Sequence, residues 1–325
     1  MKLRRRQLLE LAAAALALPI AARGARALDY PTRPVHLMLG FPPGGGADIV
    51  ARLVGQSLSE RLGQPFVIEN RPGGGSNVAA ETVVRAPPDG YTLLEVTAAN
   101  ASNATLYQNL SFNFVRDIAP VASVSRGAFV MVVNPSFPAQ TVPEFVAYAK
   151  ANPGKINMAS SGIGITTHIF GALFMTMAGI DVIHVPYRGG APAITALLGG
   201  EVQVYFSPLP EPLEQIKAGR LRALGVTTAT RVAALPDVPS IGDFVPGYEA
   251  SGWQGIGAPR DTPVEIVDKL NSAVNAMLAD ARFQARLAEL AITVFPSSRA
   301  EFRRLIADET ERWGKVIRAA GIKAE

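Results

Sequence analysis

The stretch Leu37-Met38-Leu39-Gly40-Phe41-Pro42-Pro43-Gly44-Gly45-Gly46-Ala47-Asp48 is an apolar run that breaks into a glycine-rich turn and then reopens as a helix. A strand, turn and helix of this kind leave backbone N–H groups directed outward at the positive end of the helix, which favours anions. The stretch therefore predicts capture of an anion, either a phosphate or a carboxylate.

The first 27 residues have the pattern of a cleaved secretory signal peptide. Lys2 and residues 4–6 supply basic charge before an apolar run over 8–20, and Ala25-Arg26-Ala27 is a small-residue cleavage site. The apolar run is too short to span a membrane. Residues 5–9 also fit a twin-arginine signal loosely, so both export routes stay open. We expect a mature chain that begins near residue 28 and is soluble in the periplasm.

The charge of the mature chain is close to neutral. Removing the six basic residues and one acidic residue of the leader from the totals of 31 and 27 leaves 25 basic and 26 acidic residues. No basic stripe remains, so nucleic-acid binding is not expected. The chain has no cysteine, which excludes disulfides, thiolate nucleophiles and zinc-thiolate sites. Its length favours two domains.

Short apolar or β-branched runs alternate with amphipathic patterns, which is typical of an α/β fold with largely parallel sheets. The expected strands are Val35–Phe41, Phe66–Glu69, Tyr91–Val96, Phe129–Val133, Ile156–Ser160, Val182–Pro186, Val202–Phe206 and Leu221–Thr227.

Helical periodicity is clearest after the first glycine-rich turn. A helix beginning near Asp48 should stop at Gly63, and a second should run from about Thr166 to Gly179. The segments Pro263–Leu278 and Arg299–Ala320 predict two further long helices with charged outer faces. The second helix follows the turn Ser161-Gly162-Ile163-Gly164, so the strand, glycine turn and helix occur twice. Ligands collect at the carboxyl ends of parallel strands, and two such units can face one cleft.

Nucleotide binding is disfavoured by the details of the first turn. No Lys-Ser/Thr pair follows the glycines, so the turn is not a phosphate-binding P-loop. Gly44 and Gly46 are followed by Ile49 where a dinucleotide fingerprint needs a third glycine. Export also removes the chain from the nucleotide pool.

Hydrolytic and metal chemistry have few candidate residues. There is no Gly-x-Ser-x-Gly motif, and the three histidines, His36, His168 and His184, form no metal-binding pair in the sequence. We expect His36 at a surface or strand edge and His184 in a structural hydrogen bond. His168 follows the second turn, where contact with a ligand and helix packing are both open. No metal or cofactor is predicted.

The remaining chemistry is binding by backbone N–H groups and hydroxyls. Charge-assisted bonds from such donors to a carboxylate are about twice as strong as neutral ones. Ser160, Ser161, Thr166 and Thr167 supply hydroxyls around the second turn. The alternative is that Asp48 and Thr166 only cap helices and that the glycines only make turns.

Four ordered motifs carry a family resemblance over the mature chain. They are Phe41–Asp48, Glu69–Gly75, Pro88–Leu94 and Val185–Gly189. With them the chain resembles the tripartite tricarboxylate transporter substrate-binding proteins, also called Bug proteins. The resemblance implies a periplasmic-binding-protein fold of type II, with two α/β domains joined by crossover strands around a ligand cleft. It places one domain at 28–125 plus 251–325 and the other at 126–250.

The resemblance also implies a function and a site. Members of the family capture carboxylated metabolites such as citrate, other di- and tricarboxylates, acidic amino acids and some aromatic acids. They serve a membrane permease or a sensor, and we expect a monomer. In them the two glycine turns hold a ligand carboxylate from both sides. The expected ligand-binding residues here are Phe41, Pro43, Gly44, Gly45, Gly46, Asp48, Thr97, Ser160, Ser161, Gly162, Gly164, Thr166, Thr167, His168 and Ser207.

Two positions depart from the family pattern. Ile165 stands where relatives have a threonine, although Thr166 can compensate for the lost hydroxyl. Ser207 stands where relatives often carry an aspartate that would suit an amino group on the ligand. The departure at Ser207 favours a plain organic acid over an acidic amino acid.

Other classes of function stay open from the sequence. An exported enzyme acting on organic acids needs a titratable group beside the ligand, and Asp48 and His168 are the candidates. We expect Asp48 instead to cap its own helix. A scaffold or adhesin that uses the fold without a ligand is the third possibility.

Overall fold

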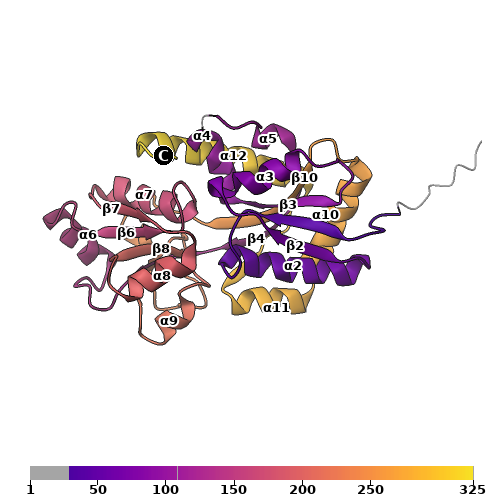
Figure 1. The fold of residues 1–325 in the computed structure, drawn as a ribbon. Coiled ribbons are helices and arrows are strands. Elements are labelled where there is room, and N and C mark those ends of the chain that lie inside the picture. The colour runs from indigo at the N-terminus through magenta and orange to yellow at the C-terminus, as the bar shows by residue number, and fades with distance from the viewer. Residues whose placement is uncertain (1–28, 108, 325) are drawn as a thin grey trace, which may run out of the picture.

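The computed structural model describes residues 29–107 and 109–324, which form two α/β lobes lying side by side (Figure 1). The expected signal peptide at 1–27 lies outside the described residues. Each lobe contains one sheet with helices on both faces. The α/β fold with two lobes matches the expected fold class.

The larger lobe is built on a six-stranded sheet in the order β11-β4-β10-β3-β1-β2. Its first three strands in chain order form a parallel unit, since β1 lies between β2 and β3. The strands are β1 (Val35–Leu39), β2 (Phe66–Asn70), β3 (Thr92–Thr97), β4 (Ile118–Gly127), β10 (Gly252–Pro259) and β11 (Ile292–Val294).

The smaller lobe is built on a five-stranded sheet in the order β7-β6-β8-β5-β9. Here β6 pairs in parallel with β7 and β8, whereas β5 runs antiparallel to β8 and β9. The strands are β5 (Phe129–Val133), β6 (Asn157–Ser160), β7 (Ile183–Pro186), β8 (Val204–Pro208) and β9 (Arg222–Val226).

All eight predicted strands are present, but the expectation of largely parallel sheets is wrong. Of the strand pairs among the described residues, β1–β2, β1–β3, β6–β7 and β6–β8 are parallel, and the other five are antiparallel. The central pair of the larger sheet is antiparallel because the chain passes between the lobes twice. It leaves the larger sheet along β4 and returns along β10, so these two strands pair antiparallel at its centre.

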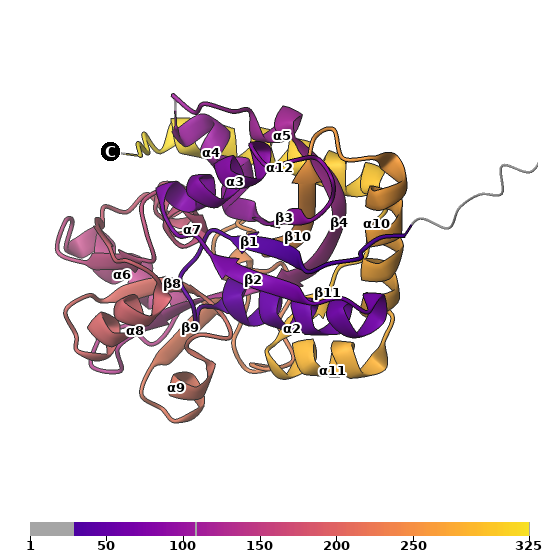
Figure 2. The same ribbon diagram turned by 45° about the vertical axis from the view of Figure 1, so that its right-hand side comes forward.

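Helices cover both faces of the larger sheet (Figures 1 and 2). One face packs against α2 (Gly46–Leu62), α10 (Val264–Leu278) and α11 (Ala281–Glu289). The other packs against α3 (Asn77–Val84), α4 (Ala98–Leu106), α5 (Phe114–Asp117) and α12 (Arg299–Ala319). The predicted helices in the C-terminal third are confirmed as α10 and α12.

The smaller sheet is covered in the same way. One face packs against α6 (Val142–Ala151) and α7 (Thr166–Ala178), the other against α8 (Gly190–Leu198) and α9 (Leu213–Lys217). Two 3-10 turns, Gly74–Ser76 and Ile241–Asp243, complete the elements. The predicted ends of the first two helices at Gly63 and Gly179 are confirmed, because both glycines adopt the left-handed conformation that ends a helix.

The C-terminal helix α12 contacts both lobes. Trp313 and Ile317 on this helix share a buried cluster with Phe170 of α7 and Leu106 of α4. The rings of Trp313 and Phe170 lie 5.0 Å apart between centroids. The helix α12 therefore joins the two lobes through buried apolar contacts.

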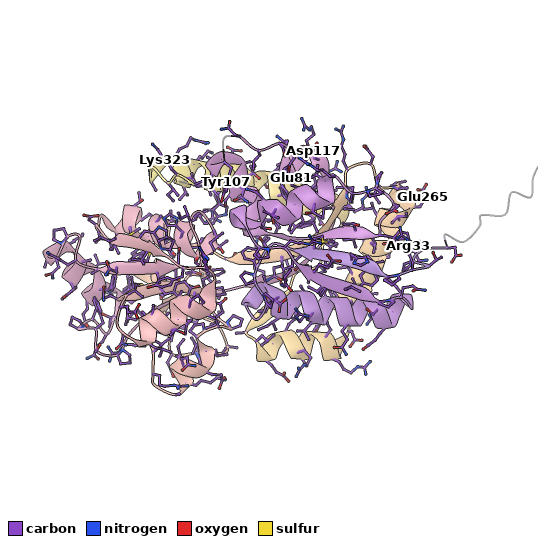
Figure 3. All side chains as sticks on the ribbon, in the orientation of Figure 1. Arg33, Glu81, Tyr107, Asp117, Glu265 and Lys323 are labelled. Atoms are coloured by element: carbon purple, nitrogen blue, oxygen red, sulfur yellow. The ribbon has the colours of Figure 1, made fainter. Side chains whose placement is uncertain are left out.

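Charged side chains project from the outer surface, as Arg33, Glu265 and Lys323 do in Figure 3. Within 29–107 and 109–324, none of the helices combines the length and the apolar character that a membrane crossing requires.

Candidate functional site

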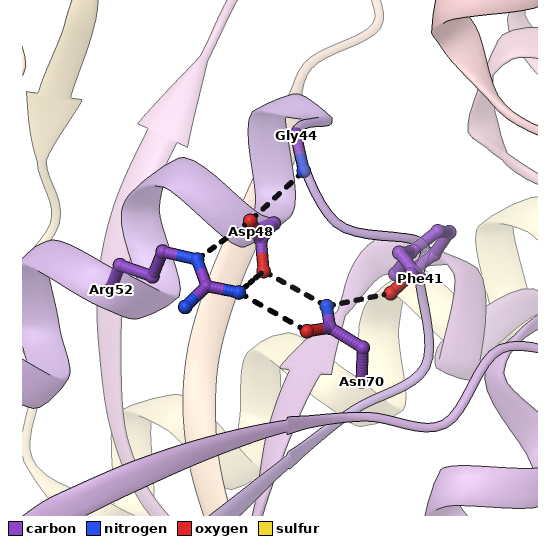
Figure 4. A network of polar contacts seen from close by, with 5 residues as sticks. All are labelled: Phe41, Gly44, Asp48, Arg52 and Asn70. Carbon is purple, nitrogen blue, oxygen red and sulfur yellow. Dashed lines mark hydrogen bonds and ion pairs between the residues drawn. The ribbon is translucent and has the colours of Figure 1, made fainter.

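The first glycine turn has a defined backbone geometry. Gly44 is left-handed with φ 84°, Gly45 is extended at the N-cap position, and α2 begins at Gly46. The helix therefore starts two residues before the predicted Asp48. The N–H of Gly44 donates to Asp48 Oδ2 at 3.0 Å, which closes the turn onto the first turn of the helix (Figure 4).

Asp48 is the centre of a buried polar network rather than a ligand-facing group. Its carboxylate also accepts from Arg52 at 2.8 and 3.0 Å and from Asn70 at 2.9 Å (Figure 4). Asn70 donates in addition to the carbonyl of Phe41 at 3.0 Å, so the network holds both ends of the turn. Burial raises the pKa of Asp48, but the hydrogen bonds from Arg52, Gly44 and Asn70 outweigh it, and the net pKa lies below the ordinary value.

The expectation that Asp48 caps its own helix is wrong in its detail. Gly45 is the N-cap residue and makes no side-chain cap. The carboxylate instead accepts from Gly44, which precedes the helix, and the side chain is only 4% exposed. Asp48 therefore shapes the turn and has its charge neutralised by Arg52.

Replacing Asp48 with alanine is expected to destabilise the protein by about 2 kcal/mol, because the buried donors of Gly44 and Asn70 lose their acceptor. The folded-state pKa of Asp48 is lowered, so this stability is present above the unfolded pKa and is lost as the pH falls through the folded value. Chemical denaturation at pH 7 and at pH 3 measures both effects. Asp268→Ala, which breaks the exposed pair with Arg299, is the control. If Asp48→Ala and Asp268→Ala lowered the free energy of unfolding equally at pH 7, the structural role of Asp48 would be contradicted.

The second glycine turn repeats the design of the first. Gly164 is left-handed with φ 71°, Ile165 is extended at the N-cap position, and α7 begins at Thr166. The N–H of Gly164 donates to Nδ1 of His168 at 3.1 Å. His168 therefore occupies the place in this turn that Asp48 occupies in the first. Thr166 is the first helical residue and not the cap.

His168 and His184 form a structural pair. Their rings stack with centroids 3.6 Å apart and planes 6° from parallel, and Ser160 Oγ lies 2.6 Å from His184 Nε2. Burial, aided by His184, lowers the pKa of His168 to about 3, and burial lowers the pKa of His184 to about 4. Both rings are neutral at pH 7, which leaves Nδ1 of His168 free to accept. The expected hydrogen bond of His184 is present, and His36 is part-exposed beside Glu69.

The two turns open onto one cavity of about 160 Å³ between the lobes. Four helices begin at this cavity, because its lining includes the first residues of α2, α4, α7 and α8. These residues are Gly46 and Ala47, Ala98, Thr166 and Thr167, and Gly190 and Ala191. The first N–H groups of a helix have no partner within the helix, and each helix start carries partial positive charge. The cavity is therefore suited to a small anion.

The expected ligand-binding residues divide into two groups. Eight of them line the cavity: Phe41, Pro43, Gly45, Gly46, Thr97, Ser161, Thr166 and Thr167. The other seven are not among the lining residues: Gly44, Asp48, Ser160, Gly162, Gly164, His168 and Ser207. Members of this second group make hydrogen bonds to the turns and to neighbouring side chains. They hold the lining residues in place without lining the cavity themselves.

Several lining residues from the lobe crossings and from the region of α8 were not predicted from the sequence. They include Phe129, Trp253 and Gln254 at the crossings, and Arg188, which lies two residues before α8. The sequence did indicate Arg188, because Arg188-Gly189-Gly190 is a third glycine turn before an apolar helix. The most consequential omission is Glu211, a carboxylate in the lining whose sequence context gave no sign of it.

Two α/β lobes with an anion-suited cavity between them define the periplasmic solute-binding class of proteins. Within this class the chain belongs to the tripartite tricarboxylate transporter family of receptors, whose family model matches residues 50–322. The resemblance inferred from the four motifs is thereby confirmed.

Individual relatives agree with this assignment. BugT of Bordetella pertussis is 33% identical over 316 residues, which cover 96% of this chain and 95% of BugT. The structure of R. palustris Rpa4515 with adipate is 38% identical with a TM-score of 0.87, over 91% of this chain and 99% of the other. MatC of Rhodopseudomonas palustris with bound malate is 30% identical with a TM-score of 0.83, over 89% of this chain and 100% of MatC.

Proposed function

We propose that this protein captures a small carboxylate in the cavity between its lobes, outside the cytoplasm, and delivers it to a membrane permease or a sensor. The observation that carries the proposal is the convergence of four helix N-termini on one cavity. Each contributes a partial charge of roughly +0.5. Removal from water strengthens the attraction between these dipoles and a bound anion.

The chemistry of the lining favours a carboxylate over a phosphate. Among the described lining residues, Arg188 and Glu211 are the only ionisable ones, and neither turn has the lysine of a phosphate loop. Two relatives of known structure hold adipate and malate, both small carboxylates. The leader at 1–27 supports export to the periplasm.

We extend the proposal to the mode of binding. The segments 28–125 plus 251–325 and 126–250 act as two domains that close on the ligand, and the chain crosses between them near Ala128 and Ser251. A ligand that contacts both domains favours the closed arrangement by its extra affinity for it. Phe41 and Thr166 come from opposite domains and both line the cavity, which supports this mode.

The proposal includes no chemical conversion of the ligand. Asp48 and His168, the two catalytic candidates from the sequence, hold the turns and do not line the cavity, so the described ionisable groups beside the ligand are Arg188 and Glu211. Prolonged incubation of the protein with a bound acid should return that acid unchanged. Formation of a product would favour the enzyme instead.

Thermal unfolding with a panel of adipate, malate, citrate and glutamate tests the proposed function. An acid at a hundred times its dissociation constant adds about 2.7 kcal/mol to the stability of the folded state. In a protein of this size this raises the melting temperature by about 4 °C or more. Gly45→Leu is the control. Gly45 has ordinary backbone angles, so the variant should fold, but its added side chain would extend beside the cavity and should abolish the ligand-induced shift. No shift in the wild-type protein with any of these acids, together with no binding of the diacids and amino acids titrated in the next section, would contradict the proposal.

A further inference from the structure

Glu211 places a carboxylate in the wall of the cavity. It lies between β8 and α9, and it accepts three hydrogen bonds at the long end of the normal range. Gly46 N–H donates to Oε1 at 3.4 Å, and the hydroxyls of Ser207 and Tyr205 donate to Oε2 at 3.3 and 3.4 Å. Gly46 belongs to the larger lobe, so the carboxylate also bridges the two lobes.

The described residues leave one acceptor position of the Glu211 carboxylate without a donor, and Glu211 lines the cavity. An ionised carboxylate offers about four acceptor positions, of which three are taken here. A side chain on Gly190 would place its Cβ 2.1 Å from Oε2, so only glycine lets the start of α8 approach the carboxylate this closely. The starts of α2 and α8 thus offset part of the negative charge.

Asp48 and Glu211 both place a carboxylate near the start of α2, but among the described residues only Asp48 has a basic side chain as its partner. Asp48 is paired with the guanidinium of Arg52 at 2.8 Å. Within residues 29–107 and 109–324, Glu211 has hydrogen bonds to neutral donors only, and burial raises the pKa of its carboxyl above the ordinary value, so a cation beside it would favour the ionised form. A buried carboxylate without a cation is costly unless a partner compensates its charge. Because Glu211 lines the cavity, such a partner can come from the ligand.

We propose that the ligand is a carboxylate that also carries a cationic nitrogen, and that Glu211 pairs with this nitrogen. The inference rests on the proposed function and assigns the chemical class of its ligand. The N–H of Gly46 is already engaged by Glu211, so the ligand carboxylate lies toward the starts of α4 and α7 and toward Arg188. The cavity then offers a zwitterion both donors for its carboxylate and the carboxylate of Glu211 for its nitrogen. Ser207 does not indicate a cleft without a carboxylate, because it supports that of Glu211.

Matched pairs of ligands test this inference by isothermal titration calorimetry at pH 7.5. The probes are adipate with 6-aminohexanoate, glutarate with 5-aminopentanoate, and succinate with 4-aminobutanoate. Within at least one pair we expect the amino acid to bind at least tenfold more tightly, because the second carboxylate of the diacid is repelled by Glu211. Glu211→Gln keeps the shape and removes the charge, so it should weaken the amino acid and strengthen the diacid by about tenfold each.

Glu214→Gln is the matched control, since this side chain pairs with Lys217 on the exposed face of α9. It should leave every affinity unchanged. Tighter binding of the diacid in every pair, or an unchanged preference in Glu211→Gln, would overturn the assignment of Glu211 while leaving carboxylate capture intact. If none of the six probes and none of the four acids of the thermal panel binds the wild-type protein, the proposed function fails and the inference fails with it.

Discussion

Replacing Thr166 with aspartate is expected to lower the affinity for a cavity-bound carboxylate at least a hundredfold while the fold stays intact. Thr166 is the first residue of α7 and lines the cavity. An aspartate there would place a negative charge where the ligand carboxylate is held. Two charges about 4 Å apart repel by about 4 kcal/mol near a protein surface, which exceeds the hundredfold loss in affinity.

The same substitution should not destabilise the folded protein, because acidic residues in the first turn of a helix are favourable by about 0.3–1 kcal/mol. Calorimetric titration with the acid that gives the largest thermal shift measures the affinity, and thermal unfolding without ligand measures the stability. Thr166→Asn is the neutral control of similar size and should keep affinity within tenfold of the wild type. Undiminished binding by Thr166→Asp would show that the carboxylate lies elsewhere.

Replacing Glu95 with leucine is expected to stabilise the protein by at least about 2 kcal/mol at pH 8. Glu95 is fully buried on β3, and neither of its carboxylate oxygens has a hydrogen-bond partner. It faces the same side of the sheet as Leu93, which belongs to the apolar core under α2 and α10. Leucine has a similar size and removes the polar group.

The stabilisation should depend on pH with a defined sign. Burial raises the pKa of Glu95 well above its ordinary value, so the folded protein keeps this proton after the unfolded chain has lost it. The wild type therefore loses about 1.4 kcal/mol of stability per pH unit from this group, from near pH 4.5 up to the folded pKa. Urea denaturation of both proteins from pH 4.5 to 8 should give a difference that grows with pH. A constant difference would contradict a buried, protonated Glu95.

The elements that position the two turns could be predicted from the sequence because their signals are local. Alternating and apolar runs identified eight strands, including those that precede the two glycine turns. Gly63 and Gly179 marked helix ends because a left-handed residue is needed there. The repeated strand, glycine turn and helix correctly indicated that both turns face one cavity.

Three strands were not predicted: β11 has only three residues, and β4 and β10 are interrupted by glycine, proline and other small residues. Gly255 shows the reason. A Cβ at this position would lie 2.3 Å from Phe302 and 2.6 Å from the carbonyl of Ala122, so packing of α12 onto the sheet requires glycine. Such a residue has low strand propensity and is selected by a contact distant in sequence.

The role of individual site residues also depends on distant contacts. Asp48 stood in the motif and was expected at the ligand, but Arg52 and Asn70 draw it away from the cavity. Glu211 belongs to no recognisable sequence motif. It lines the cavity because β8 ends beside the start of α2. Sequence spacing identified the turns, while the direction of each side chain was set by tertiary packing.

Native mass spectrometry of the mature protein tests carboxylate capture in the cavity most directly. The wild type and Thr166→Asp are each mixed with the same pool of small carboxylic and amino acids and then sprayed from a volatile buffer. We predict one small acid bound per wild-type chain, with unchanged mass after long incubation, and none on Thr166→Asp. A wild-type chain that binds no acid from the pool, or a variant that retains the acid to the same extent, would contradict the account.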